Sequence, residues 1–598
     1  MEPPSQGPAG KEPAVVEPRE KSAKTETKTK NENPENPKKE DGMTKSSLYN
    51  PLEWARYSKN YWDNLVGNFT LQFIVLLTSC YYGVKGVLYT FVMSGQLPYF
   101  QKYVGITGIE YQKYKLVSSL PWAMKAWIGL ISDNYPIRGY NKRYYLYIST
   151  FVGAVSFAIL GIVEINQATA FFAALLLFFA SLDMATADLL CEGKYAEKMM
   201  EKPETSSDLV SWVWGVYQLG CLSASLFIGP ISDNYSPKII YLCAVPFALQ
   251  FLVPLYNGYL PEEKVKPALE QATQVDIEKK EKLSVWIAML PRKMREKPRV
   301  FVMAFLTALS ALLLGVVHLV GTEGQQLAYS LGASVMLCVC SSWALPSVLS
   351  NANIYMFLCQ VLYIQVNGAQ DYFYTAGKEC FDGPSFSFSY YTTYTVIVGS
   401  VAAWLGVVLF QAWMRDWNFR RVFWLTTFVR VIGSIFDICI AKRWNLNIGI
   451  SDKTMYMFGD AVIYNIVYQM DFMPSVVLTS KVCPKGLEST IYALLAGMQN
   501  MGQNVSQSLG AYMITAMGVK TACKPSVDEE CDCDFSNLPQ LLFICHMFLP
   551  LLTIPLTFVL IPNIKMTDPI EVGGDYYELI KEDNRNDLQV ELRGKDGL

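Results

Sequence analysis

Histidine is scarce in this chain of 598 residues, which contains only His318 and His546. Two histidines so far apart cannot form the HExxH zinc site of a metalloprotease, and G-x-S-x-G and P-loop motifs are absent as well. Asp460 follows Gly459 without the preceding Gly-x of an intramembrane aspartyl protease. We therefore predict no catalytic centre, no metal site and no cofactor, and expect a protein that is not an enzyme.

A strong excess of one charge is also missing. The formal net charge is −3 at pH 7, so no basic surface for nucleic acid is predicted. The alternating ten-residue segments of a membrane β-barrel are absent. The first 50 residues are rich in Pro, Glu, Lys, Asn and Thr and lack the apolar core of a cleaved signal peptide, which predicts a disordered cytosolic tail.

Long apolar runs, by contrast, are abundant. Hydrophobic residues make up 51% of the chain and charged residues 17%. The charges fall between apolar runs of about 20 residues, the length that an α-helix needs to cross a bilayer. Lipid provides no partner for backbone N–H and C=O groups, so helices are the favoured spanning structure. The sequence therefore predicts an all-α polytopic membrane protein whose surroundings are the lipid bilayer.

The runs predict about 14 transmembrane helices in a six, two and six arrangement. The predicted spans are 69–93, 112–132, 144–165, 168–191, 208–230, 239–258, 300–320, 327–346, 353–375, 389–411, 422–441, 455–478, 488–517 and 538–561. The predicted parts are a cytosolic tail at 1–50, an N-terminal six-helix bundle at 51–258, a cytosolic central loop at 259–299, an inserted two-helix hairpin at 300–350, a C-terminal six-helix bundle at 351–562 and a cytosolic tail at 563–598.

Lysine and arginine gather in the joints on one side of these spans, which predicts a cytosolic N-terminus. Four of the 14 cysteines then fall in outer loops, where an oxidising environment favours disulfides. They allow three pairings; two disulfides that tie the loops before spans 389–411 and 538–561 are expected, with free thiols as the alternative. The four are Cys380, Cys523, Cys531 and Cys533.

One pentapeptide occurs twice. ISDNY ends the span 112–132 at Ile131–Tyr135 and follows the span 208–230 at Ile231–Tyr235. These two spans are equivalent in an inverted three-plus-three repeat, so the match supports that architecture.

The first copy lies in LPWAMKAWIGLISDNYPIRGYNKRYY, from Leu120 to Tyr145. Gly129 allows a neighbouring helix to approach, Asp133 emerges at the membrane surface, and basic residues follow it. This pattern resembles the loop between the second and third spans in the major facilitator superfamily. The longer pattern, together with CDFSNLPQLLFICHMFLP from Cys533 to Pro550, resembles the folate-biopterin transporter family, a branch of that superfamily. The predicted gating residues are Gly129, Asp133, Arg138, Lys142 and Arg143.

Charged residues inside the spans need a partner, a wet cavity or a function, because each costs roughly 2.5–3.5 kcal/mol at mid-membrane. Lys85 shares a helical face with Thr78, Tyr82 and Tyr89, which predicts a polar cavity or a structural ion pair. Lys125 lies two turns before Asp133. The span 168–191 and its end contain acids at a place where they recur in the folate-biopterin family, which implies a role in transport or proton coupling. These acids are Asp183, Asp188 and Glu192.

Amides and phenols on two later spans suit the edge of a heterocycle such as a pterin, and aromatic rings can stack on its face. Interhelical hydrogen bonding is the alternative for the amides. Arg430 could meet a substrate carboxylate, although pairing with Asp437 or Asp471 is the favoured role. The predicted substrate-binding residues are Lys85, Tyr89, Lys125, Asn367, Asp371, Gln499, Gln503 and Arg430.

The resemblance implies a major facilitator fold that moves folate or a pteridine such as biopterin across the plasma membrane, driven by protons, through alternating access. Carriage of S-adenosylmethionine or a monocarboxylate remains open, as does a nutrient receptor that binds without translocating. Among these, fold and transport depend on the spans, and the substrate depends on the resemblance.

Overall fold

The computed structural model describes residues 51–202, 205–264, 298–378, 380–482, 488–521 and 533–568. The predicted tail at 1–50, nearly all of the central loop and most of the tail at 563–598 lie outside these ranges. Contacts divide the chain into Met1–Asn60 and Tyr61–Leu598. Helix α1 (Pro51–Phe69) includes the boundary, and the architecture below is that of the larger unit.

The helices of the larger unit follow the predicted spans closely. Before the central loop they are α2 (Leu71–Thr78), η2 (Ser79–Leu88), α3 (Tyr89–Pro98), η3 (Tyr99–Val104), α4 (Gly108–Ala123), α5 (Lys125–Asn134), α6 (Arg143–Ile162), η4 (Gln167–Thr169), α7 (Ala170–Glu201), α8 (Ser206–Asn234), α9 (Lys238–Leu249) and α10 (Leu252–Tyr256).

After the central loop the helices are α14 (Pro298–Val320), α15 (Glu323–Ala344), α16 (Ser347–Leu362), α17 (Asn367–Thr375), η7 (Ser389–Tyr394), α18 (Thr395–Leu409), η8 (Phe410–Met414), α19 (Phe419–Ala441), α20 (Trp444–Asn447), α21 (Asp452–Tyr456), η9 (Met457–Tyr464), α22 (Asn465–Val482), α23 (Glu488–Ala516), α24 (Leu538–Leu542), η10 (Phe543–Phe548), α25 (Leu549–Leu551) and α26 (Thr553–Leu560).

Among the described residues, 10 helices are long and apolar enough to cross a membrane, or 11 if the bent pair α16 and α17 is one span. This count is lower than the predicted 14. The other three predicted spans, 112–132, 455–478 and 488–517, do fold as helices: α4 with α5, α21 to α22, and α23. They fall outside the count because polar and charged side chains lower their hydropathy.

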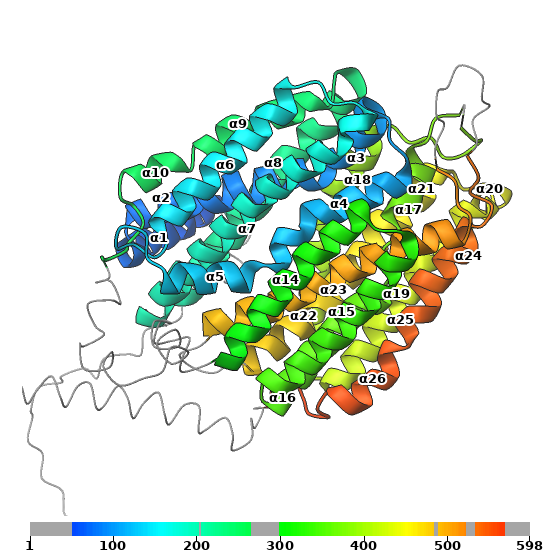
Figure 1. Cartoon of the computed structure of the whole chain (residues 1–598). Helices are drawn as coiled ribbons and strands as arrows, with labels where there is room; N and C mark the ends of the chain where they lie inside the picture. The colour runs from blue at the N-terminus through cyan, green and yellow to red at the C-terminus, as the bar shows by residue number, and fades with distance from the viewer. Residues whose placement is uncertain are drawn as a thin grey trace, which may run out of the picture. The chain divides into compact units, whose positions relative to one another are not determined.

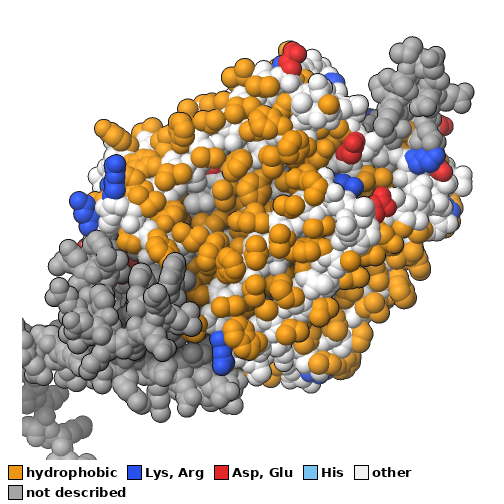
Figure 2. Space-filling model, in the orientation of Figure 1, with side chains coloured by type: hydrophobic (Ala, Val, Ile, Leu, Met, Phe, Trp, Pro, Cys, Tyr) orange, Lys and Arg blue, Asp and Glu red, His pale blue; other side chains and the backbone are white. Residues whose placement is uncertain are grey.

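The surface supports a position in lipid. Figure 2 shows one face on which hydrophobic side chains cover the middle of the helices and charged side chains gather near their ends. Large apolar side chains such as Phe151, Trp404 and Phe558 are more than half exposed. Exposure of that kind is unfavourable in water but favourable against acyl chains. The all-helical polytopic fold predicted from the sequence is confirmed.

The helices before and after the central loop pack mainly among themselves, and a few pairs join the two sets (Figure 1). In the first set α6 contacts α7 and α9, and in the second α18 and α19 contact α22. Contacts between the sets include α4 with α17 and α23, α5 with α23, α8 with η7 and α18, and α14 with α4 and α5. Within the second set, both α14 and α15 contact α23. The pair α14 and α15 therefore lies against the polar helices α4 and α23.

Several spans are interrupted where polar residues are present. Helix η2 is a π-helical segment, α4 and α5 are separated at Met124, and α16 and α17 meet at a 42° bend. Widened turns and breaks change which side chains share a face, and they are frequent at functional sites. They also leave backbone groups to be satisfied by side chains from neighbouring helices.

A disulfide joins Cys380 to Cys533, whose positions are 153 residues apart. The predicted tie between the loops before spans 389–411 and 538–561 is therefore confirmed for one bond. Cys523 and Cys531 lie outside the described residues.

Candidate functional site

A buried ion cluster lies in the first set of helices. Asp188 on α7 pairs with Lys85 of η2 at 2.7 Å and with Lys125 of α5 at 2.6 Å, while Glu192 lies 3.9 Å from Lys125. Asp188 is only 1% exposed. The Asp188 and Glu192 carboxylates together offset the charges of two ammonium groups from two other helices, which is the kind of compensation that embedded charges need.

Aromatic rings surround the Lys85 ammonium group. Its nitrogen lies 5.3 Å from the ring centre of Tyr81, 5.2 Å from Trp214 and 5.7 Å from Tyr217. Ring faces attract cations, so they hold this ammonium group while leaving it 17% exposed. Lys85 is therefore both paired and accessible.

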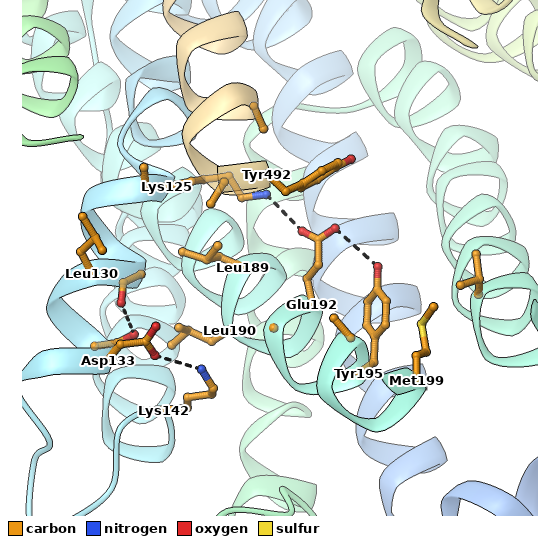
Figure 3. A pocket seen from close by; sticks show the side chains of 18 of the residues that line it. Lys125, Leu130, Asp133, Lys142, Leu189, Leu190, Glu192, Tyr195, Met199 and Tyr492 are labelled. Atoms are coloured by element: carbon orange, nitrogen blue, oxygen red, sulfur yellow. Dashed lines mark hydrogen bonds and ion pairs between the residues drawn. The ribbon is translucent and has the colours of Figure 1, made fainter. Parts of the chain in front are cut away.

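A cavity of about 510 Å³, called the first cavity, lies where α5, α7, α8 and α23 meet. Figure 3 shows Lys125 directed at Glu192, which also accepts a hydrogen bond from Tyr195. At the other side of the same cavity, Lys142 pairs with Asp133 at 3.3 Å. This end of the helices is called the Asp133 end below; it is the predicted cytosolic end.

The other predicted gating residues surround that turn. Arg138 lies over the ring of Tyr144 at 5.5 Å, and Arg143 over that of Tyr140 at 5.2 Å. Gly129 faces Leu189 of α7 so closely that an added Cβ would lie 3.3 Å from its Cδ2 atom. Among the described residues, Asp133 forms an ion pair with only one of the three basic residues, Lys142. Both partners belong to the first set of helices.

The second cavity, about 320 Å³, lies between the two sets of helices. Four predicted substrate-binding residues line it. The cavity combines aromatic rings, amides and two lysines, and it neighbours the first cavity because Trp214 lines both. Its lining includes Lys85, Tyr89, Lys115, Trp122, Trp214, Gln365, Asn367, Gln503 and Gln507.

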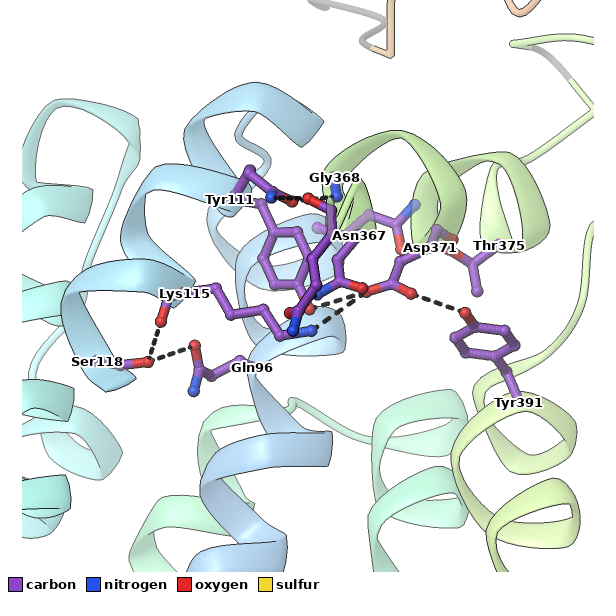
Figure 4. Close-up of polar contacts among 12 residues, drawn as sticks. Gln96, Tyr111, Lys115, Ser118, Asn367, Gly368, Asp371, Thr375 and Tyr391 are labelled. Atoms are coloured by element: carbon purple, nitrogen blue, oxygen red, sulfur yellow. Dashed lines mark hydrogen bonds and ion pairs between the residues drawn. The ribbon is translucent and has the colours of Figure 1, made fainter. Parts of the chain in front are cut away.

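The third cavity, about 430 Å³, shares Lys115 and Met93 with the second. Asp371 of α17 lines it and accepts hydrogen bonds from Tyr111 at 3.1 Å and Tyr391 at 2.8 Å, while its carboxylate lies 3.6 Å from Lys115 (Figure 4). These partners come from α4 and η7. Asp371 therefore connects both sets of helices beside the cavity.

Beyond Asp371 the two sets are in direct contact. The Gln112 side chain donates to the carbonyls of Gln365 at 2.6 Å and Gln507 at 3.0 Å, and accepts from the N–H of Gly368 at 2.7 Å. An added Cβ at Gly108 would lie 2.1 Å from the carbonyl oxygen of Gly368, so only glycine allows this approach. The helices are closed together here.

Some predicted residues lie elsewhere. Asp183 is fully buried and accepts a hydrogen bond from Thr150 at 3.1 Å, within the first set. Arg430 pairs with Asp471 at 3.1 Å, the favoured role, and with Gln499 lines a separate space of only about 30 Å³. Asp437 instead accepts from Tyr374. The structure thus keeps Arg430 and Gln499 out of the three larger cavities.

The sequence alone did not reveal several lining residues. Lys115 lies inside the predicted span 112–132, and a charge within a span was the available signal. The sequence contains no comparable signal for Trp122 and Trp214, because tryptophan is also common at lipid interfaces. The predicted stripe of Thr78, Tyr82, Lys85 and Tyr89 is divided: Thr78 accepts from the Trp212 indole at 2.9 Å, while Lys85 and Tyr89 line the cavity.

The fold of the chain is similar to that of solved transporter structures. The chain is similar to a D-xylose-proton symporter, with a TM-score of 0.51, 14% identity and coverage of 84% of this chain and 99% of that one. It is also similar to a POT family transporter solved with 5-aminolevulinic acid, with a TM-score of 0.55, 12% identity and coverage of 81% and 94%. These likenesses define an all-helical polytopic membrane protein with a major-facilitator-like fold.

The family is more specific. The model of the BT1 family matches residues 85–578, and the chain belongs to this family of folate-biopterin transporters. It is therefore a transporter-family protein and not an enzyme. "Probable folate-biopterin transporter 6" of Arabidopsis thaliana is 24% identical over 87% of each chain. The "Folate-biopterin transporter" of Synechocystis is 22% identical over 72% of this chain and 70% of its own. "Folate transporter 2" of Plasmodium falciparum is 21% identical, covering 78% and 83%.

Proposed function

We propose that this protein transports folate or a related pteridine across a membrane by alternating access, coupled to protons. The observation that supports this most directly is the 320 Å³ cavity between the two sets of helices. It presents ring faces, amide donors and acceptors, and two ammonium groups in one space. Family membership supports the same substrate class.

The cavity offers each part of such a ligand a matching group. The rings of Tyr89 and Trp122 can stack on a pterin, and the amides of Asn367 and Gln503 can bind its edge. Lys85 and Lys115 can bind the carboxylates of a folate tail. Both lysines already have carboxylate partners, so a ligand carboxylate would compete with Asp188 and Asp371 for them.

This competition provides a route for proton coupling. A ligand carboxylate that takes Lys85 leaves Asp188 with Lys125 alone, and the displaced charge favours uptake of a proton by Asp188 or Glu192. The two acids lie on consecutive turns of α7 beside the first cavity, which offers a path for the proton. Asp183 is the third predicted coupling residue, held by Thr150.

We further propose that α4 with α5, α21 to α22, and α23 are spans despite their polarity. Added to the 11 apolar spans, these three give the 14 of the sequence prediction. The polar residues that lower their hydropathy include those lining the cavities, as transport through a central path requires. The boundaries of two six-helix bundles and an inserted hairpin, and residence in the plasma membrane, remain part of this proposal.

A solute without net negative charge, such as S-adenosylmethionine, is the second candidate. The observation in its favour is that Lys85 and Lys115 each already have a carboxylate partner, so the cavity does not require an anion. A monocarboxylate would leave most of the rings and amides without contacts.

The first test is accumulation. Vesicles containing the full chain should concentrate labelled folate above the external level, and unlabelled biopterin should compete. S-adenosylmethionine and pyruvate are tested in the same assay. Saturation at one ligand per protein, without release of the label on vesicle lysis, would instead identify a receptor. Accumulation of S-adenosylmethionine alone would replace the proposed substrate.

A further inference from the structure

The repeated pentapeptide ISDNY folds the same way twice. Ser132 and Ser232 each donate to a carbonyl of the preceding turn, at 2.9 Å and 2.6 Å, and Asn134 and Asn234 each donate to the carbonyl four residues earlier, at 2.8 Å and 3.0 Å. Both helices end at the asparagine. The repeated pentapeptide therefore forms the same local structure twice, a helix end that presents an aspartate.

The two aspartates have different partners. Asp133 pairs with Lys142 of its own set of helices and lines the 510 Å³ cavity, whose opposite wall includes Tyr492 of α23. Asp233 contacts the second set: its carboxylate accepts the backbone N–H of Phe388 at 2.9 Å and of Ser389 at 2.7 Å. Asp233 therefore bridges the two sets of helices, and the Asp133 ion pair does not.

The amides that Asp233 binds belong to the start of a long helix. Ser389 begins the continuous span Ser389–Met414, whose first N–H groups have no partner within the helix. A carboxylate at such a position gains from both hydrogen bonds and the helix dipole. The contact is thus charge-dependent.

Neighbouring contacts keep the two helices close. The N–H of Gly229 donates to the Thr393 hydroxyl at 3.2 Å, and that hydroxyl donates to the Ser225 carbonyl at 2.5 Å. An added Cβ at Gly229 would lie 2.5 Å from the Ser389 Cα atom, so the backbones touch. Lys102 donates to the carbonyls of Ser232 and Asp233, which holds the end of α8 in place.

From this geometry we propose that Asp233 is the latch of the end of the molecule opposite Asp133, here called the Asp233 end. Its carboxylate holds α8 against η7 while that end is closed, and it must leave the amides of Phe388 and Ser389 for that end to open. The inference rests on alternating access from the proposed function, and it does not depend on the substrate.

The test measures opening without any ligand. Ser94 lines the third cavity, beside Asp371 and Tyr391, so Ser94→Cys provides a thiol that a reagent from the Asp233 end reaches when that end opens. A membrane-impermeant maleimide is applied from that side to the full chain in membranes. The labelling rate of the unchanged chain, which keeps Ser94, is subtracted to remove the contribution of the native cysteines.

Adding Asp233→Asn should raise this rate about tenfold, the change expected from weakening one charge-assisted contact. The matched control is Asp133→Asn, the same change in the other copy of the motif, which should not raise it. If Asp233→Asn fails to reach the membrane, Thr393→Val decides, because it removes two hydrogen bonds of the same interface and keeps the side-chain shape. The latch would be overturned if the variant that reaches the membrane is labelled no faster than Ser94→Cys alone, whether or not folate is transported.

Discussion

At the scale of single residues, Asp188 is the centre of the buried charges. It lies between Lys85 and Lys125 and is only 1% exposed, so water cannot readily take its place as a partner of the two ammonium groups. Breaking a buried pair by removing one partner leaves an uncompensated charge, which costs about 3–5 kcal/mol. The cluster is therefore sensitive to the balance of charge more than to the identity of any one lysine.

Asp188→Asn is expected to lower the thermal midpoint of the protein in detergent, because two ammonium groups then share only Glu192. Adding Lys85→Met should restore part of the loss, since Lys125 keeps its contact with Glu192 at 3.9 Å. Fluorescence-detected gel filtration after heating measures both. Asp416→Asn, at an exposed carboxylate, is the control. A double variant less stable than Asp188→Asn would contradict charge compensation.

Sequence reasoning succeeded with these residues because embedded charges are conspicuous. Lys85, Lys125, Asp188 and Glu192 were all singled out by their position in apolar runs, and the structure brings them together. Arg430 was singled out by the same rule and lies in a different cluster, with Asp471. A charge within a span indicates that a partner exists, but the contact between helices decides which partner it is.

At the scale of elements, the interrupted helices determine what the cavities contain. The bend between α16 and α17 exposes backbone groups that Gln112 of α4 binds, and the π-helical turns of η2 place Lys85 and Tyr89 on the cavity while Thr78 faces Trp212. An ideal period of 3.6 residues predicts one stripe for all of them. The difference arises because a widened turn rotates the residues that follow it.

The disulfide between Cys380 and Cys533 can be tested chemically. Proteolysis without reduction should yield a cross-linked peptide pair containing Cys380 and Cys533, which separates on reduction. The variant Cys380→Ala with Cys533→Ala should lose stability by about 2–4 kcal/mol, because the bond closes a long loop in the unfolded chain. Thermal midpoints check this, with Cys439→Ala, a free cysteine, as the control. An unchanged midpoint would show that the loops are held by other contacts.

At the scale of the whole molecule, the two ends differ. The Asp233 end is closed by Gln112, by the Gly108 and Gly368 contact and by Asp233, whereas the 510 Å³ cavity lies toward the Asp133 end. The first, second and third cavities follow one another between these ends. An ion cluster lies at each junction between them: Lys85 and Lys125 with Asp188, then Lys115 with Asp371. A state closed at one end and hollow toward the other is what alternating access requires.

Proton coupling is tested on the whole molecule. An inward proton gradient should accelerate uptake of folate into vesicles, and Asp188→Asn should abolish that acceleration while exchange of internal for external folate continues. The reason is that exchange needs the binding site but no net proton movement. Initial rates with and without the gradient provide the measurement, at matched protein abundance. Uptake that ignores the gradient in the parent would make the protein a uniporter.

The sequence by itself determined that this chain consists of membrane helices, where most of them begin and end, and which family pattern they contain. These are local properties, since an apolar run of sufficient length leaves the backbone no alternative to a helix in lipid. Only the tertiary structure decided that Lys115, Trp122 and Trp214 line the cavity, that Arg430 and Gln499 do not, and that Asp233 bridges two helix sets. Those outcomes depend on which helices touch and how they bend, and distance along the chain does not encode such contacts.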